Sequence, residues 1–124
     1  MAKDLKMVLL LDFYGEMLTD KQREIIESYY YDDLSLGEIG EARGISRQGA
    51  RDAIKRSETE LIEMEKRLGL VKRFKEMEAA LTRICDCAIE IREKNAAASA
   101  DPDIDSLALD ILDTTAKLVE EENK

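Results

Sequence analysis

Six polar side chains between positions 46 and 56 have types and a spacing that suit nucleic-acid binding. They are Ser46, Arg47, Gln48, Arg51, Lys55 and Arg56. An arginine can donate two hydrogen bonds to a guanine edge and a glutamine can pair with an adenine edge, whereas hydroxyl and ammonium groups suit phosphate oxygens. This chemistry matches the major groove of double-stranded DNA. The six side chains are therefore our candidate contact surface.

The distribution of charge favours the same segment. The 124 residues carry a net charge of −9, which argues against a nonspecific nucleic-acid coat because phosphate contacts require concentrated Lys and Arg. Residues 35–57 nevertheless carry five basic and three acidic side chains, whereas residues 96–124 carry two and eight. Because charges are screened over about 8 Å at physiological salt, a local basic patch can still bind a polyanion. The excess is largest within residues 43–56, which carry five basic side chains and one acidic, and we expect such contact only there.

Apolar spacing and capping patterns predict an all-helical chain. The first helix is expected over residues 3–18. Its apolar stripe consists of Leu5, Val8, Leu9, Phe13 and Met17. Thr19 with Gln22, and Ser35 with Glu38, fit the capping box in which two side chains satisfy the first amides of a helix. These pairs predict the starts of the next two helices.

The segment over residues 34–56 has the pattern of a helix-turn-helix. Gly40 is small where the second helix must cross closely, and Gly44 suits the left-handed position that ends a helix. Ser46 can cap the second helix, and Ile54 can anchor it in the core. This arrangement leaves the candidate contact residues on the outward face.

The second half of the chain predicts two long helices. The second helix of the helix-turn-helix continues to Gly69 with a heptad seam of Ala50, Ile54, Ser57, Leu61, Met64 and Leu68. Past Gly69 the seam resumes in the first of the two long helices as Phe74, Met77, Leu81, Ile84, Ala88 and Ile91. A loop over residues 95–103 precedes a last helix capped by Asp101 or Asp103. The apolar side of this helix consists of Ile104, Leu107, Ile111, Leu112, Leu118 and Val119. We expect a helix-turn-helix domain over residues 1–70 and a C-terminal helical hairpin over 71–124, for dimerisation or partner docking.

The apolar seams predict a homodimer. A chain this small leaves Leu61 to Leu68 and Phe74 to Ile91 poorly covered unless the last helix or a second protomer packs on them. A dimer would present two recognition helices to a pseudo-palindromic site.

Five motifs resemble a known family when they are taken together. They are DFY, LTDKQ, YY-DD-SLGEI, SRQ and IKR-E, all between Asp12 and about Leu70. The stretch resembles the YlxM-like family of small helix-turn-helix proteins associated with signal recognition particle genes in Gram-positive bacteria. Its helix-turn-helix is also similar to region four of bacterial sigma factors. The resemblance implies an all-helical DNA-binding regulator or accessory factor of the signal recognition particle pathway.

Five positions depart from that family. Its members read SRQAVYDNIKR where this chain has Gly49, Ala50, Arg51 and Ala53. A glycine inside a helix costs about 0.5–1 kcal/mol relative to alanine. Arg43 stands where a Leu or Phe normally closes the turn, so its aliphatic stem would have to cover the core. Arg51 adds a cation to the exposed face.

The composition excludes several other classes. Without histidine, the chain has neither Ser-His-Asp nor Cys-His nucleophiles nor mixed His/Cys zinc sites, and we expect no catalysis and no cofactor. Cys85 and Cys87 would diverge by about 200° on a helix, so we expect buried or half-buried free thiols and no metal. No apolar run is long enough for a membrane span or a secretory signal, which predicts a cytoplasmic protein.

One alternative remains open. The acidic C-terminal segment favours an accessory factor that docks on the signal recognition particle, through its basic protein or its RNA, without binding DNA. The exposed cations would then be an ordinary solvated helix face.

Overall fold

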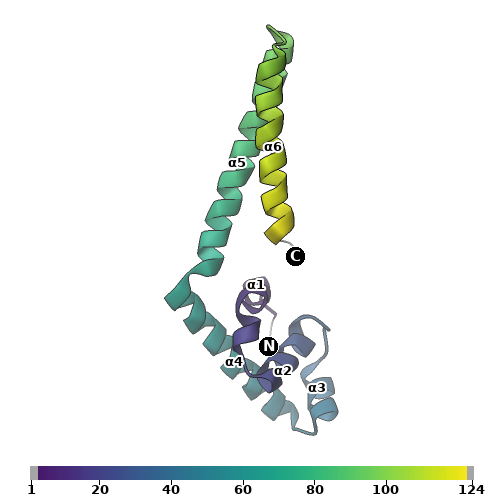
Figure 1. Ribbon diagram of the computed structural model, residues 1–124. Coiled ribbons are helices and arrows are strands. Elements are labelled where there is room, and N and C mark those ends of the chain that lie inside the picture. The colour runs from purple at the N-terminus through teal and green to yellow at the C-terminus, as the bar shows by residue number, and fades with distance from the viewer. Residues whose placement is uncertain (1–2, 123–124) are drawn as a thin grey trace. The chain divides into compact units, whose positions relative to one another are not determined.

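The computed structural model describes residues 3–122, with side chains through residue 119. Over this range the chain is helical and has no strand, which confirms the predicted all-α fold (Figure 1). The elements are α1 (Leu5–Tyr14), the 3₁₀ turn η1 (Gly15–Met17), α2 (Asp20–Tyr30), α3 (Leu36–Arg43), α4 (Arg47–Leu68), α5 (Leu70–Ala97) and α6 (Pro102–Glu122). None of the helices in the described range is both long enough and apolar enough to span a bilayer.

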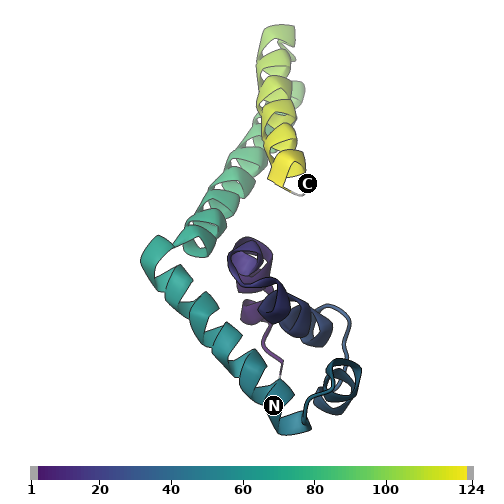
Figure 2. The same ribbon diagram turned by 60° about the horizontal axis from the view of Figure 1, so that its bottom comes forward.

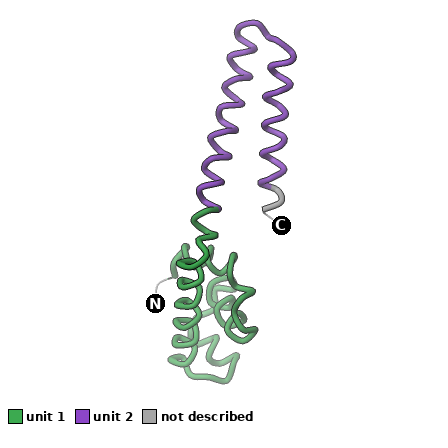
Figure 3. Tube along the Cα trace, turned by 60° about the vertical axis from the view of Figure 1, so that its left-hand side comes forward, with its two compact units in different colours: residues 1–73 green, residues 74–124 purple. Residues whose placement is uncertain are grey.

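The chain divides into two compact units, residues 1–73 and 74–124 (Figure 3). In the first unit, α4 packs against α1, α2 and α3 (Figure 2). The buried core consists of Met7, Leu11, Tyr14, Leu18, Ile25, Ile26, Tyr29, Leu36, Ile39, Ala50, Ile54, Leu61 and Val71. Leu61 is therefore covered within its own unit and needs neither the last helix nor a second protomer.

Local capping signals are confirmed throughout this unit. The side chains of Thr19 and Ser35 each accept a hydrogen bond from the amide three residues later, at Gln22 and Glu38, and both capping boxes are complete. Gly69 ends α4 in the left-handed conformation, with φ of 63°. Sequence-local chemistry thus sets where these helices begin and end.

The apolar stripe expected on α1 is right in part, because Leu9 and Phe13 pack partly buried against the core. It is wrong at Leu5, which is 87% exposed, and at Met17, which is 60% exposed; the fully buried positions of α1 are Met7, Leu11 and Tyr14. The helix has apolar residues on almost every side, so their spacing alone does not select the buried face. The chain also tightens into η1 at Gly15, which moves Met17 out of the register of α1.

In the second unit, α5 and α6 lie side by side and antiparallel, as the sequence predicts (Figures 1 and 3). Cys85 Sγ lies 3.0 Å from Thr115 Oγ1, and Arg92 Nε donates to Asp105 Oδ1 at 2.8 Å. Between these two contacts, Ala88 on α5 and Ala108 on α6 are buried. The two helices therefore approach through small and polar residues.

The loop between these helices is shorter than expected, because α5 continues to Ala97 and α6 begins at Pro102. The Asn95 side chain donates to the Asp101 carbonyl at 2.8 Å and accepts from the Asp101 amide at 3.0 Å. Asp101 also accepts from the Asp103 amide, so Asp101, and not Asp103, caps α6.

Most of the apolar side expected on α6 does not face α5. Leu112 is half-buried, but Leu107 is 64% exposed and the other members are exposed as well. The sequence pattern finds the largest apolar residues, whereas the helices meet at smaller ones. Cys87 is also exposed, contrary to expectation, although both thiols are free as predicted.

Candidate nucleic-acid interface

The turn between α3 and α4 is tight, and two glycines permit it. Gly44 adopts the left-handed conformation with φ of 68°, as expected, and the Ile45 amide donates to the Gly40 carbonyl at 2.9 Å. A Cβ on Gly40 would lie only 2.8 Å from the Ile45 carbonyl oxygen and 3.2 Å from the Ser46 backbone. The close crossing predicted at Gly40 is therefore present.

The start of α4 is capped and anchored. Ser46 Oγ accepts from the Gly49 amide at 2.9 Å, which satisfies one of the free amides of the first turn. Ala50 and Ile54 are fully buried against the core. Gly49 is accommodated beside the cap, where an added Cβ would come within 3.1 Å of Ser46 Oγ. These contacts fix which side of α4 faces outward.

The candidate contact residues are all exposed, and we call them the recognition face: Ser46, Arg47, Gln48, Arg51, Lys55 and Arg56. With about 100° between successive helical residues, Arg47, Arg51 and Lys55 form one row along α4, and Gln48 lies beside it. Arg56 is rotated by about 100° from Lys55 and lies at the edge.

The cations differ in whether a carboxylate pairs with them. Arg43 Nη1 donates to Glu24 Oε2 at 2.7 Å, so α2 neutralises the charge at the end of α3. In the described part of the chain, four cationic side chains of the recognition face have no carboxylate within 4 Å: Arg47, Arg51, Lys55 and Arg56. Their charge is available to an external anion.

One contact within the face was missed by the sequence analysis. Gln48 Nε2 donates to Asp52 Oδ1 at 2.9 Å. The signal was present, since residues four apart on a helix are neighbours. The Gln48 amide nitrogen must therefore leave Asp52 to donate to a base, whereas its carbonyl oxygen is not used in this bond.

Lys55 lies near a second carboxyl group. Burial raises the pKa of Glu58, and the positive charge of Lys55 opposes that rise. Glu58 Oε1 is buried and has no hydrogen-bond partner in residues 3–122. Because Glu58 offsets part of the charge on Lys55, we expect Lys55 to contribute less to anion binding than Arg51.

The glycine-dependent turn, the capped second helix and its buried anchors define the class: this is a helix-turn-helix protein. A family model described as "Putative helix-turn-helix protein, YlxM / p13 like" matches residues 1–99.

Relatives agree with that match. The chain is 49% identical over 117 residues to a UPF0122 protein of Thermoanaerobacter sp. (strain X514), covering 94% of this chain and 93% of the relative. It is 57% identical over 81 residues to one of Caldanaerobacter subterraneus, covering 65% and 69% of the two chains. A Listeria monocytogenes relative is 46% identical over 79 residues, with 64% and 72% covered. The chain therefore belongs to the UPF0122 family, whose model carries the description of a helix-turn-helix protein.

Proposed function

We propose that this protein is a DNA-binding regulator that inserts the start of α4 into the major groove. The observation that carries the proposal is the row of exposed cations without ion-pair partners on a capped and anchored helix. Arg47 and Arg51 are the candidates for guanine edges, and Gln48 for adenine. Ser46, Lys55 and the N-terminus of α4 suit phosphate oxygens.

The charge of the molecule predicts how this binding behaves. The net charge of −9 opposes DNA at long range, so we expect modest affinity that falls steeply with salt. Fluorescence anisotropy with a mixed-sequence 20-base-pair duplex at several salt concentrations measures both quantities. Arg47→Ala and Arg51→Ala should each weaken binding about 5- to 100-fold and lower the salt slope by about 1.

Arg67→Ala is the matched control, because Arg67 is an exposed arginine on the same helix but outside the recognition face. It should leave affinity and salt slope unchanged. If Arg67→Ala and Arg51→Ala lowered the duplex affinity equally, the recognition face would not be the contact surface.

The acidity of α6 supports a second candidate function. Helix α6 carries one basic and seven acidic side chains, which suits docking on a basic protein. The family resemblance makes the protein subunit of the signal recognition particle the partner to test. A variant that combines Asp103→Asn, Asp110→Asn and Asp113→Asn should fail to capture that purified subunit while keeping its duplex affinity. If this variant still captured the subunit, and if Arg51→Ala weakened duplex binding, the results would favour the DNA regulator.

We also propose that the protein acts as a homodimer. Two copies would present two recognition faces to one pseudo-palindromic site, which is how small helix-turn-helix proteins gain affinity.

A further inference from the structure

The hairpin unit exposes its large apolar side chains. Six of them, each between 39% and 50% exposed, are Met77, Ile84 and Ile91 on α5 and Ile104, Ile111 and Leu118 on α6. We call these six residues the apolar face. The residues that the hairpin buries are Ala88, Asn95, Ala108 and Thr115, so no large apolar side chain is fully buried within residues 74–119.

The three residues of the apolar face on α5 and the three on α6 point to the same side of the hairpin. Within each of these two triads the members are seven residues apart, so each triad forms a straight column along its helix. On α5, Ile84 lies four residues before the buried Ala88, and on α6, Ile104 lies four residues before the buried Ala108. Each apolar column is therefore displaced around its helix, by the same angle and in the same direction along the chain, from the residues that face the other helix. Because the helices are antiparallel, equal rotations turn both columns toward one face.

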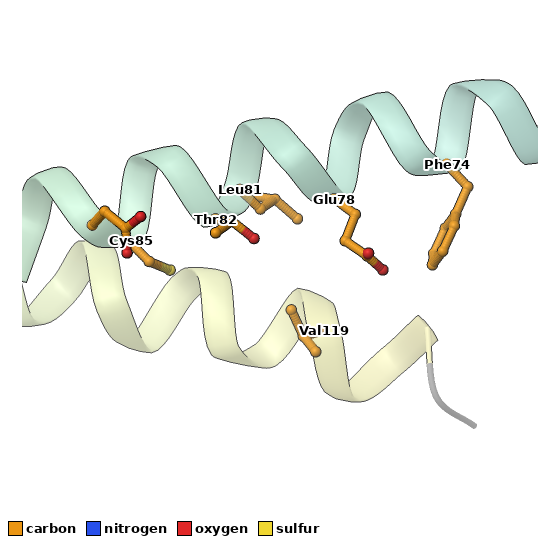
Figure 4. Close-up of a pocket in the computed structure, with 7 residues that line it drawn as sticks. Phe74, Glu78, Leu81, Thr82, Cys85 and Val119 are labelled. Atoms are coloured by element: carbon orange, nitrogen blue, oxygen red, sulfur yellow. The ribbon is translucent and has the colours of Figure 1, made fainter.

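The opposite face of the hairpin is different in character. A groove of about 330 Å³ lies there, lined by Phe74, Glu78, Leu81, Thr82, Cys85, Asp86 and Val119 (Figure 4). A second groove involves Ile89, Arg92 and Asp105. Polar and small side chains interrupt this surface, so the continuous apolar columns are confined to the apolar face.

We propose that the apolar face binds the same face of a second copy, forming a four-helix bundle in which α5 packs on the partner's α6. This inference deepens the proposed homodimer by assigning its interface. A hairpin with only small buried residues gains little from its own packing, and a second hairpin would cover both columns.

Charge selects the arrangement of the two hairpins. Helix α6 has one basic and seven acidic side chains, whereas α5 has six and five. Packing α6 on the partner's α6 would bring two acidic helices together, which is unfavourable. Packing α5 on the partner's α6 avoids this repulsion and makes all neighbouring helices antiparallel. Both copies of α5 then begin at the same end of the bundle, and both helix-turn-helix units connect there.

The molar mass of the full chain, measured by light scattering at micromolar concentrations, tests the interface. The wild type should have twice the 14.1 kDa mass of one chain, and Ile84→Asp and Ile111→Asp should each give monomers. Ile89→Asp is the matched control, because Ile89 is 46% exposed, like Ile84 at 45%, but lies on the opposite face. This variant should remain dimeric. A monomeric wild type, or equal dissociation by Ile84→Asp and Ile89→Asp, would overturn the proposal.

A distance measurement tests the arrangement without altering the apolar face. A chain carrying Cys85→Ser, Cys87→Ser and Arg73→Cys is spin-labelled near the start of α5. With α5 on the partner's α6, the labels should lie within about 25 Å of each other, given interaxial spacings of 8–10 Å. With α5 on the partner's α5, the rise of 1.5 Å per residue separates them by about 40 Å, and that result would refute the arrangement.

Neither measurement involves nucleic acid, so the interface and the DNA-binding proposal can fail separately. Arg51→Ala should lose duplex affinity while keeping the mass of a dimer.

Discussion

Gly40→Ala is the sharpest test of how the turn positions the recognition face. The added Cβ would lie 2.8 Å from the Ile45 carbonyl oxygen and 3.2 Å from the Ser46 carbonyl carbon. These are backbone atoms of the turn itself, so the clash is relieved only if α3 and α4 separate. Alanine in place of glycine gains up to about 1 kcal/mol of helix propensity, whereas overpacking costs about 1–3 kcal/mol. We expect a net loss of about 1–2 kcal/mol in the free energy of unfolding.

The same helix offers a matched control. A Cβ on Gly37 would meet only Ser35 Oγ, at 3.9 Å, so Gly37→Ala should be neutral or stabilising by up to about 1 kcal/mol. Urea unfolding followed by circular dichroism gives both values. If Gly40→Ala proves as stable as the wild type or as Gly37→Ala, the close crossing does not constrain the turn and our account of it is wrong.

Three further substitutions test other parts of the first unit. Ser57 is buried and its hydroxyl has no partner in the described chain, so Ser57→Ala should raise the unfolding free energy by about 1 kcal/mol; a loss would show that the hydroxyl is satisfied. Tyr14 donates to Glu65 Oε1 at 2.6 Å and accepts from the Leu70 amide at 3.1 Å; Tyr14→Phe should cost about 1–3 kcal/mol, and an unchanged urea midpoint would contradict this role. Burial raises the pKa of Glu58, so the folded state binds more protons than the unfolded state and stability falls as pH rises from about 4.3 through the folded pKa. Glu58→Gln should therefore be more stable than the wild type at pH 7.5 but not at pH 3.5, and the same difference at both values would refute the burial argument.

Sequence predicts the helix-turn-helix well because its determinants are local. The caps at Ser35 and Ser46 and the left-handed Gly44 depend on the chemistry of a few adjacent residues. The exposure of the recognition face follows once Ala50 and Ile54 are assigned to the core.

Features set by distant contacts were not predictable in the same way. Helix α1 is apolar on most sides, so only its neighbours decide that Met7 is buried and Leu5 is exposed. Glu24 and Arg43 pair across 19 positions, a spacing that carries no local signal. In the hairpin, close approach depends on Ala108, and hydrophobicity ranks that residue below the larger Leu107.

Backbone amide chemical shifts of the full chain during titration with a 20-base-pair duplex test the central claim most directly. We predict that the largest changes fall on residues 46–56, with little change over residues 103–113. Changes confined to α6, with residues 46–56 unaffected, would contradict the assignment of the recognition face to DNA.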